Sequence, residues 1–440
     1  MAMIQRPKGT ADVVPAQAYK WHTVEKLASE TAEQFGFKEI RVPTFEETGL
    51  FLRSVGETTD VVQKEMYTVT ATGDSEFTLR PEGTAGVMRA VIENGILNDG
   101  FPQKLYYILS CFRHENVQKG RLREFHQFGC EMVGSADAKA DADVISMAKS
   151  FMDRIGLRDI ELNINSIGCP TCRAKYQQAL REYFGARRDE LCDTCKERLE
   201  KNPMRLLDCK SPICKEIGKN APLIIDYLCD ECADHFEKLK KYLGLMGIDF
   251  VVNPRIVRGL DYYTRTVFEF ISKDIGAQGT VCGGGRYDGL IEELSGKAVP
   301  ALGFAMGIER LILTMEAQKC DFMEEKTCDL YIASMGDDAA DKAMELAMEL
   351  RDEGYFVEYD LMGRGIKPQM KYAGKIGAKF VLVIGSSELE TGCAKLKNMA
   401  SGEQADIKLD DTFIDNFSNA LMAEMFKDID GEMAALLGKE

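Results

Sequence analysis

Apolar residues recur at helical spacing near the start of the chain and then give way to strand-like runs. One face of the segment Pro15–Phe35 carries an apolar residue every three or four positions, which predicts an amphipathic helix. A short strand, Lys38–Pro43, is expected after it. Two further runs, Met66–Thr70 and Glu76–Arg80, are typical of a hairpin, and a helix is expected from about Glu82, after a proline.

Two longer, aromatic-rich runs predict central strands of a sheet. Leu105–Glu115 and Leu122–Val133 are largely apolar, and the polar loop Asn116–Arg121 separates them. Another strand is expected at Ile160–Ser166. The pattern then becomes helical and cysteine-rich up to about Asp249, before strand signals return at Phe250–Val252 and Thr266–Ile271. We therefore expect residues 168–250 to be a helical insertion into one sheet domain that spans residues 1–325.

The pattern changes again near Asp321–Thr327, where we expect a second domain boundary. Beyond it, predicted strands alternate with predicted helices, which is typical of a small α/β layer domain. The strands are Asp329–Ala333, Phe356–Tyr359 and Phe380–Ile384, and the helices are Asp338–Glu353 and Lys367–Ile376. This domain is expected over residues 328–425, with an acidic tail at 426–440. The whole chain is predicted to be an α/β protein.

Length and composition narrow the function classes. A chain of 440 residues is too long for one ordinary domain. Its net charge of −16 argues against a surface that binds nucleic acid all round, although it leaves a local basic face open. No run of ~18 apolar residues is present, so no membrane span is expected. The first residues lack the apolar core of a signal peptide, so we expect a cytoplasmic protein.

The stretch FRHENVQKGRLREFHQFGCE, residues Phe112–Glu131, concentrates basic residues between two predicted strands. Arg113 at a strand end is well placed to hold an α-phosphate bidentately. Arg121, with its basic neighbours, could hold the outer phosphates of a nucleotide, and Phe125 could stack on adenine. A basic surface hairpin is the alternative, and composition alone does not separate the two.

Two other segments favour the nucleotide interpretation. In GFAMGIERLIL, Gly303–Leu313, a strand of small residues leads into a helix whose first turn carries Arg310. This segment resembles motif 3 of the class II aminoacyl-tRNA synthetases, and Phe112–Glu131 resembles their motif 2. GFKEIRVPTF, Gly36–Phe45, resembles motif 1, which in that family builds the dimer interface. The resemblance implies an antiparallel sheet with helices in an α+β catalytic core, ATP with Mg²⁺, and a homodimer.

Further motifs resemble those of the histidyl members of the family. They are TLRPEGTAG at Thr78–Gly86, RGLDYYTRTVFEF at Arg258–Phe270 and GGGRYDGL at Gly283–Leu290. The resemblance implies that L-histidine is bound through Glu82, Thr84, Arg113, Gln127, Glu131, Arg258, Tyr262 and Tyr263. Glu82, Thr84 and Gln127 would meet the α-amino group, and Glu131 and Tyr263 the two imidazole nitrogens, one a donor and one an acceptor. The glycines Gly283–Gly285 permit close backbone approach or a tight turn.

The implied reaction joins histidine to ATP as histidyl-adenylate and then transfers it to the 3′ end of tRNA(His). Arg113 and Arg258 would stabilise charge on the α-phosphate from two sides, so both are candidate catalytic residues. ATP would be held by Arg113, Arg121, Phe125 and Arg310. Where the family commonly has Arg-Pro before Gln118, this chain has Asn116-Val117, which removes a positive charge expected near the tRNA end.

The C-terminal domain resembles the anticodon-binding domain appended to this subgroup. Its own residues carry no diagnostic nucleic-acid motif, so an interaction domain is the alternative. Four basic residues near its second helix could contact phosphates or simply be solvated; they are Arg364, Lys367, Lys371 and Lys375.

Eight of the fourteen cysteines fall in the predicted insertion, and six of the eight form C-x2-C pairs. The pairs Cys169/Cys172 and Cys192/Cys195 are nineteen residues apart, a spacing typical of a four-thiolate zinc site. The remaining four, which could complete a second site, are Cys209, Cys214, Cys229 and Cys232. Spacing does not decide which pairs combine. Reduced structural cysteines are the alternative, and the family resemblance does not supply this metal.

Two functions compete with a histidine–tRNA ligase. One is the catalytically inactive relative that serves as a regulatory subunit in histidine biosynthesis, which lacks the C-terminal domain. The other is a zinc-organised RNA-binding protein that uses the synthetase core as a scaffold. The presence of Arg113, Glu131, Arg258 and Arg310 together favours the enzyme.

Overall fold

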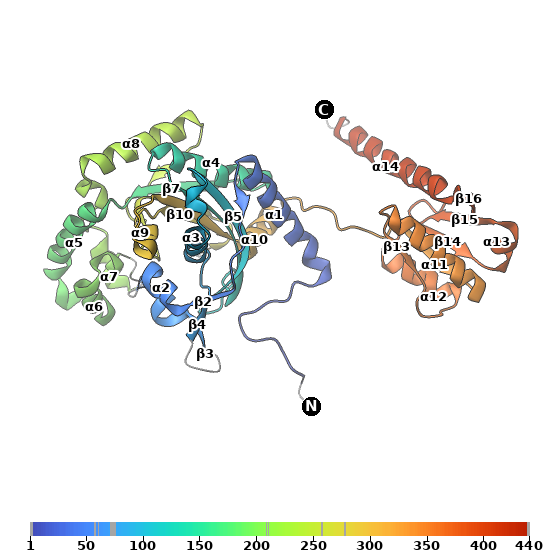
Figure 1. Cartoon of the computed structure of the whole chain (residues 1–440), viewed down its shortest axis with the longest axis horizontal. Helices are drawn as coiled ribbons and strands as arrows, with labels where there is room; N and C mark the ends of the chain where they lie inside the picture. Colours follow the sequence, from blue (N-terminus) through green and yellow to red (C-terminus); the bar gives the residue numbers. More distant parts are fainter. Residues whose placement is uncertain are drawn as a thin grey trace. The chain divides into compact units, whose positions relative to one another are not determined.

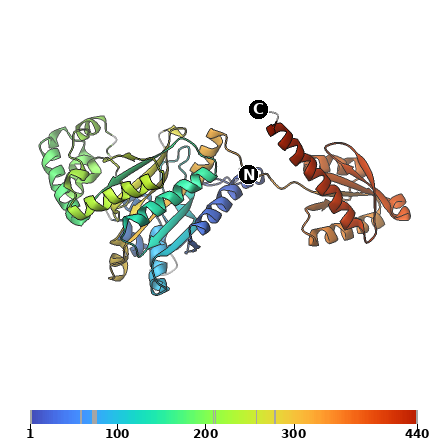
Figure 2. The ribbon, with the colours of Figure 1, turned by 90° about the horizontal axis from the view of Figure 1, so that it is seen from above.

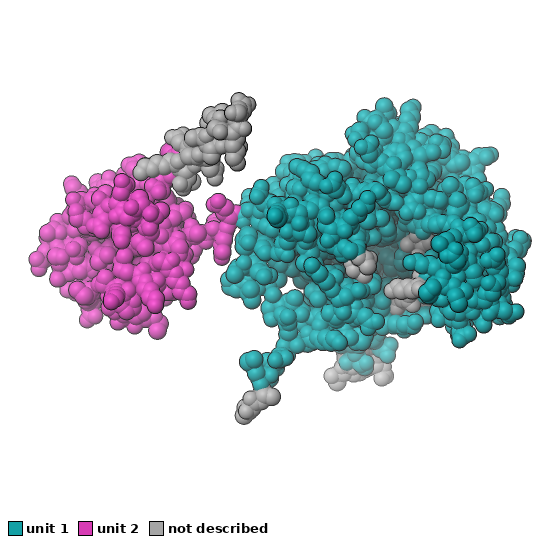
Figure 3. All heavy atoms as spheres, turned by 180° about the vertical axis from the view of Figure 1, so that it is seen from behind, with its two compact units in different colours: residues 1–323 teal, residues 324–440 magenta. Residues whose placement is uncertain are grey.

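A computed structural model of the chain shows two compact units, residues 1–323 and 324–440 (Figure 3). The structure describes all residues except 1–2, 57–58, 60, 71–75, 208, 210, 257, 277–278 and 438–440. Each unit has its own sheet and its own core. Among the described residues, no helix combines the length and the apolar character needed to cross a membrane.

The first unit is built on an eight-stranded, mainly antiparallel sheet (Figure 1). In spatial order its strands are β1 (Lys38–Glu39), β5 (Gln103–Phe112), β6 (Glu124–Val133), β11 (Ala301–Gly307), β10 (Thr280–Arg286), β9 (Thr264–Ser272), β7 (Ile160–Ser166) and β8 (Val251–Val252). Only the outermost pairs, β1 with β5 and β7 with β8, are parallel. The predicted sheet with helices is therefore confirmed.

One face of this sheet carries the main core of the unit. The helices that cover it are α1 (Pro15–Gln34), α4 (Ala138–Arg154), α8 (Asp230–Leu245) and α10 (Ile308–Gln318) (Figure 2). Proline suits the first position of α1, and Asp137 caps α4 by accepting the N–H of Lys139 at 2.8 Å. Side chains along a strand alternate between the faces, so Phe128, Cys130 and Met132 of β6 enter this core.

The opposite face is covered only in part, by α3 (Thr84–Glu93) and α9 (Leu290–Ser295). Beside them lie helix α2 (Thr48–Val55) and a small sheet of β2 (Phe45–Glu47), β4 (Glu76–Leu79) and β3 (Tyr67–Thr70). Because alternation sends Gln127, Gly129 and Glu131 of β6 to this face, the polar half of the strand points away from the main core. The candidate site lies here.

The segment between β7 and β8 forms a separate helical lobe plus one helix of the main core. Helices α5 (Pro170–Gly185), α6 (Asp193–Lys201) and α7 (Pro212–Gly218) share a small core of their own (Figure 1). Helix α8 instead packs Phe236, Leu239 and Leu243 into the main core. The predicted insertion at residues 168–250 thus contains a helix that belongs structurally to the sheet domain.

The second unit has a five-stranded mixed sheet. Its strand order is β13 (Val357–Tyr359), β12 (Leu330–Ser334), β14 (Phe380–Ile384), β15 (Cys393–Asn398) and β16 (Gln404–Lys408). Its helices are α11 (Asp337–Asp352), α12 (Ile366–Lys375), α13 (Ser386–Thr391) and α14 (Phe413–Leu437). The strands β15 and β16 and the helices α13 and α14 were not predicted. Helix α14 continues into the segment 426–440, which was expected to be a tail.

Several predicted bounds are wrong in detail. The strand expected at Lys38–Pro43 covers only Lys38–Glu39, because it pairs with β5 over two residues. The central strands end at Phe112 and begin at Glu124, since the chain between them turns through the Gln118–Arg121 bridge. Gly283–Gly285 lies within strand β10, so close packing and not a tight turn explains these glycines.

A buried ion pair ties the sheet to two helices. Arg286 of β10 donates from Nε and Nη2 to the carboxylate of Asp141 in α4, with distances of 2.7–3.1 Å, and neither side chain is exposed. His235 of α8 lies 3.3 Å from the same carboxylate. Burial alone would raise the pKa of Asp141, but Arg286 and His235 outweigh it and hold that pKa below its ordinary value.

Removal of the Asp141 carboxylate should strongly destabilise the first unit. Asp141→Ala leaves Arg286 buried without its main partner, which typically costs about 3–5 kcal/mol. Urea unfolding of the full chain, monitored through a spectroscopic signal that arises from the first unit, measures this loss of stability. The control is Asp143→Ala on the same helix, whose partly exposed pair with Lys104 should contribute about 0–1 kcal/mol. Equal losses in the two variants would contradict the role of the buried pair.

Candidate active site

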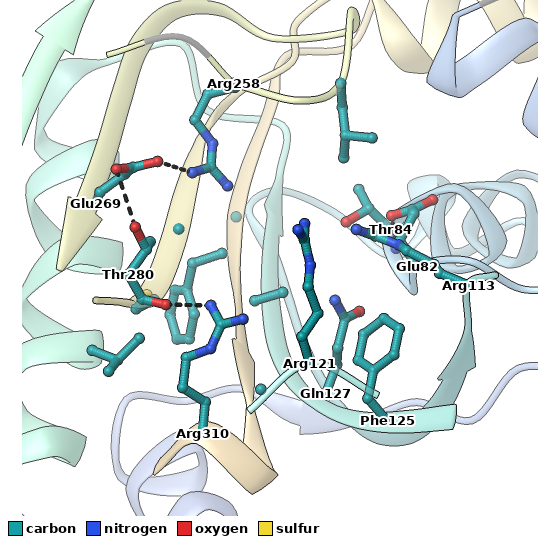
Figure 4. Close-up of a pocket in the computed structure, with 18 of the residues that line it drawn as sticks. Glu82, Thr84, Arg113, Arg121, Phe125, Gln127, Arg258, Glu269, Thr280 and Arg310 are labelled. Atoms are coloured by element: carbon teal, nitrogen blue, oxygen red, sulfur yellow. Dashed lines mark hydrogen bonds and ion pairs between the residues drawn. The ribbon is translucent and has the colours of Figure 1, made fainter. Parts of the chain in front are cut away.

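A cavity of about 350 Å³ opens on the partly covered face of the large sheet (Figure 4). Its walls come from the turn before α3, the loop between β5 and β6, the central strands and the start of α10. It brings together ten of the eleven residues proposed from the sequence for histidine and ATP: Glu82, Thr84, Arg113, Arg121, Phe125, Gln127, Arg258, Tyr262, Tyr263 and Arg310. Glu131 lies deeper, behind this wall.

The floor of the cavity is part of a row of small residues across the central strands, of which Ala305 and Gly283 line the cavity and Gly129 lies under the Tyr107 ring. Gly129 of β6, Ala305 of β11 and Gly283 of β10 are direct register partners, flanked by Tyr107 of β5 and Glu269 of β9. A Cβ on Gly129 would lie 2.2 Å from the ring of Tyr107, and one on Gly283 would lie 2.3 Å from Arg258 Nη2. The floor therefore has to be small, because neighbouring side chains occupy the space above it.

Arg258 lies directly over this floor. Its Nη1 donates to Glu269, its guanidinium lies 5.6 Å from the centre of the Tyr263 ring, and its buried Nε has no hydrogen-bond partner among the described residues. Burial alone would lower the pKa of Arg258, but Tyr263 and Glu269 outweigh it and raise that pKa. The side chain is thus a fixed cation with donor capacity left over.

Arg113 and Arg121 lie on the opposite side of the cavity (Figure 4). Arg113 Nε donates to the carbonyl of Pro81 at 2.7 Å, and its guanidinium lies 5.4 Å from the centre of the Phe125 ring. Arg121 pairs with Glu115, which also lies 3.8 Å from Arg113. One carboxylate therefore holds two arginines at the mouth of the cavity.

Arg310 projects from the first turn of α10, as the sequence predicts. It donates to the carbonyls of Thr280 at 2.6 Å and Gly120 at 3.3 Å, and its buried Nε has no hydrogen-bond partner in the part of the chain that the structure describes. Burial, together with the positive charges of Arg121 and Arg113, lowers its pKa from the ordinary value. Such crowded positive charge is the arrangement that binds a polyanion.

Glu82 and Thr84 stand at the start of α3. The carboxylate of Glu82 accepts the N–H groups of Thr84 at 2.7 Å and Ala85 at 2.9 Å, two of the N–H groups that have no partner within the helix in its first turn. Burial raises the pKa of Glu82 in spite of these bonds. Both side chains face the cavity, so a cationic or donor group there would meet an oxygen-lined wall.

Glu131 is fully buried beneath the cavity wall. Its carboxylate accepts the hydroxyls of Thr84 at 2.7 Å and Tyr107 at 3.0 Å, and also that of Tyr287. A Cβ on its register partner Gly303 would overlap the carboxylate at 1.9 Å. Burial raises the pKa of Glu131 to about 8, against the effect of these donors.

The lining also includes residues that were not proposed from the sequence, among them Glu115, Glu269, Tyr287 and Glu309. Glu309 accepts the backbone N–H and the Nδ1 of His126, and so fixes α10 against β6. All four lie inside or beside the quoted motifs. Period-two alternation would have placed Glu269 on the same face as Val267, away from the main core.

Comparisons with known proteins decide the family. A sequence profile described as Histidyl-tRNA synthetase matches residues 9–311, and one described as Anticodon binding domain matches residues 329–415. The chain belongs to the histidyl-tRNA synthetase family.

Relatives of this family cover nearly the whole chain. The histidine–tRNA ligase of Acetivibrio thermocellus is 55% identical over 408 residues, 93% of this chain and 98% of the relative. That of Clostridium novyi is 55% identical over 406 residues, 92% of this chain and 97% of the relative. The apo histidyl-tRNA synthetase structure from S. aureus has a TM-score of 0.81 at 39% identity, covering 94% of this chain and 100% of that one.

A structure from Bacillus halodurans, named ATP phosphoribosyltransferase regulatory subunit/histidyl-tRNA synthetase, has a TM-score of 0.62 at 22% identity. It covers 88% of this chain and 99% of that one. At this identity the likeness shows the shared fold only.

The eight cysteines proposed as ligands lie in two groups outside this cavity's lining. One group is Cys169, Cys172, Cys229 and Cys232, and the other is Cys192, Cys195, Cys209 and Cys214. The sequence left the combination of pairs open, and in the structure Cys169/Cys172 combines with Cys229/Cys232 and not with Cys192/Cys195. Each C-x2-C pair has a partner pair from a different part of the segment.

The raised pKa of Glu131 predicts a pH dependence of stability. An unfolded glutamate has a pKa near 4.3, so between about pH 4.5 and about pH 8 the folded state holds an extra proton. The resulting stabilisation is present at low pH and is lost as pH rises through about 8. Between about pH 5.5 and about pH 8.5, urea unfolding should therefore show a larger loss of stability for the unsubstituted chain than for Glu131→Gln.

The matched control for this measurement is the exposed Glu47→Gln, which should not change the pH dependence. Infrared difference spectra should also show the protonated carboxyl band of Glu131 disappearing near the same pH. A pH dependence unchanged by Glu131→Gln would contradict the assignment.

Proposed function

We propose that this protein is a histidine–tRNA ligase. It joins L-histidine to ATP, releasing pyrophosphate, and then transfers the histidyl group to the 3′ end of tRNA(His), releasing AMP. The observation that carries the proposal is the single cavity that gathers Arg113, Arg258 and Arg310 with Thr84, Gln127 and Tyr263, in a chain of the histidyl-tRNA synthetase family.

In the first step the carboxylate of histidine attacks the α-phosphate of ATP, and the bond to the β-phosphate oxygen breaks. We assign Arg113 and Arg258 to the α-phosphate because they approach the cavity from opposite sides (Figure 4). Each is already oriented, Arg113 by the Pro81 carbonyl and Arg258 by Glu269, so little reorganisation is needed at the moment of reaction.

The rest of ATP fits the side of the cavity nearest α10. Arg310 and Arg121 would hold its outer phosphates, and Phe125 and Arg310 would sandwich the adenine.

Mg²⁺ prefers oxygen ligands and commonly stays bound to phosphates and water. Each described carboxylate in the lining already accepts hydrogen bonds or ion pairs; these are Glu82, Glu115, Glu269 and Glu309. Mg²⁺ would therefore arrive with ATP and be held mainly by its phosphates.

Histidine fits the deeper end of the cavity. Glu82, Thr84 and Gln127 would accept the α-amino group, and Tyr262 and Tyr263 would line the pocket for the ring. Glu131 is assigned to one imidazole nitrogen, and Tyr263 to the other. Because Glu131 lies behind the wall, it would act through the hydroxyls of Thr84 and Tyr287, or directly once one of them turns aside.

The 3′ end of the tRNA needs a path to this cavity. A second cavity of about 660 Å³ shares Arg113, Glu115 and Arg121 with the first and runs toward the helical lobe. Two further arginines of the lobe, Arg198 and Arg205, line it. We propose that it receives the tRNA end, whose phosphates these cations would attract. The lobe would thereby supply positive charge that Asn116-Val117 lacks.

The second unit would hold the anticodon. Lys367, Lys371 and Lys375 are exposed at four-residue spacing on one face of α12, which suits phosphate contacts. Arg364 is already engaged within the domain: it pairs with Asp360, and its guanidinium lies 4.7 Å from the centre of the Tyr372 ring.

We further propose a homodimer through the segment that resembles motif 1. Phe45 is 54% exposed although its ring contacts that of Phe77 edge to face, and Val69 of the same small sheet is 45% exposed. Apolar side chains left exposed together are typical of a contact surface. Sedimentation analysis measures the oligomeric state: a chain that stays monomeric at working concentrations would contradict the proposed dimer.

Because the proposed substrates, histidine, ATP and tRNA(His), are found in the cytoplasm, we propose a cytoplasmic location, which cell fractionation tests.

One pair of assays separates the ligase from its alternatives. Exchange of pyrophosphate into ATP should depend on histidine, and tRNA(His) should then become charged. A regulatory subunit would show neither reaction, and an RNA-binding scaffold would bind tRNA without exchange. Absence of exchange in protein shown to be folded would overturn the proposal.

Arg258→Ala should separate chemistry from binding. Loss of one donor to a transition-state anion typically lowers the rate about 10²–10³-fold, whereas histidine affinity should change far less. Pyrophosphate exchange measures the first and equilibrium dialysis of histidine the second. The control is Arg53→Ala, an exposed arginine that does not line the cavity, which should leave both unchanged. Equal losses of rate and affinity in Arg258→Ala would contradict its catalytic assignment.

A further inference from the structure

The two cysteine groups have the dimensions of metal sites. In the first cluster, Cys169, Cys172, Cys229 and Cys232, all four Sγ atoms lie within 4.8 Å of one another. The same holds for the second cluster, Cys192, Cys195, Cys209 and Cys214. All eight cysteines are free of disulfides.

The sulfur distances fit one tetrahedral metal ion in each cluster. Cys169 Sγ lies 3.6 Å from Cys172 Sγ and 4.0 Å from Cys229 Sγ, and Cys192 Sγ lies 3.8 Å from Cys209 Sγ. Four thiolates at ~2.3 Å from a central zinc ion would be ~3.8 Å apart. A disulfide would need ~2.05 Å. An iron–sulfur cluster would need room for several irons and sulfides between the ligands.

The helices present the sulfurs in a way that stabilises thiolates. Cys169, Cys192 and Cys229 are the N-caps of α5, α6 and α8, and their partners three residues later lie in the first turns. A helix N-terminus favours negative charge. Backbone N–H groups also point at sulfur: that of Cys229 lies 3.1 Å from Cys172 Sγ, and that of Ser211 lies 3.4 Å from Cys209 Sγ.

We propose that each cluster binds one structural zinc ion through four thiolates. The metal compensates for a small core: the lobe of α5, α6 and α7 is held by one cluster of about a dozen buried residues, three of them cysteines. The first cluster joins the start of α5 to the start of α8, so it fastens the two ends of the lobe. The second cluster fastens α6 to the loop before α7 and to α7 itself.

The second zinc would also shape the path proposed for the tRNA. Its ligands Cys192 and Cys209 line the second cavity together with Arg198 and Arg205. This consequence rests on the proposed function, whereas zinc binding itself does not. Loss of the second zinc should therefore lower tRNA charging at least about tenfold, while histidine-dependent pyrophosphate exchange changes less than about twofold, because the ATP cavity keeps its own walls.

Elemental analysis of the purified full chain tests the metal directly. It should find about two zinc ions per chain. Two double variants, Cys229→Ser/Cys232→Ser and Cys209→Ser/Cys214→Ser, should each retain about one. The matched control is Cys320→Ser/Cys393→Ser, which changes two half-buried cysteines outside the clusters and should retain both ions.

A second measurement needs no variant. In the native chain the eight cluster thiols should resist a thiol reagent until a chelator removes the zinc, and cobalt added in its place should give the absorption of a tetrahedral thiolate complex. A folded chain without zinc, iron in its place, or disulfides within the clusters would overturn the proposal. Equal losses of exchange and charging in a zinc-depleted second cluster would overturn its link to the tRNA path, whatever the zinc count.

Discussion

The site depends on one packing constraint, the smallness of the residues at the centre of the large sheet. Gly129, Ala305 and Gly283 form a single row across three neighbouring strands, and larger side chains close the row at both ends. Tyr107 extends over one glycine to reach Glu131, and Arg258 lies over another. A Cβ on Gly129 or Gly283 would collide with the Tyr107 ring or the Arg258 guanidinium, so these two side chains keep their positions only because the strands carry no side chain there.

The second property of the site is the balance of positive and negative charge in the cavity above this floor. Four arginines face one cavity, and carboxylates pair with three of them: Glu269 with Arg258, and Glu115 with Arg113 and Arg121. Glu269 orients Arg258, and the carbonyls of Thr280 and Gly120 orient Arg310, yet each arginine keeps a buried Nε with no hydrogen-bond partner among the described residues. A triphosphate would therefore meet preformed cations whose cost of orientation has already been met by protein contacts.

The motifs predicted which side chains lie together: ten of the eleven residues named for histidine and ATP, among them Arg113, Arg258 and Arg310, line one cavity. Depth was not predictable in the same way. Glu131 follows Gln127 on the same face of β6, yet only the tertiary contacts with Tyr107 and Tyr287 show that it is sealed below the wall. Likewise, the apolar pattern could not separate α8 from the lobe, because its packing on α4 is a long-range contact.

The cysteines show why spacing alone does not decide the pairing when helices intervene. Cys172 and Cys192 are close in sequence, but α5 runs between them and carries the chain 16 residues along one axis, a rise of ~24 Å. That helix keeps the first two C-x2-C pairs apart, while the return of the chain toward α8 brings Cys229 to Cys169. A cluster that joins the two ends of an insertion constrains both at once, whereas two clusters built from neighbouring pairs would leave the ends independent. The observed grouping is thus the one that makes the lobe a single body fastened to the catalytic sheet.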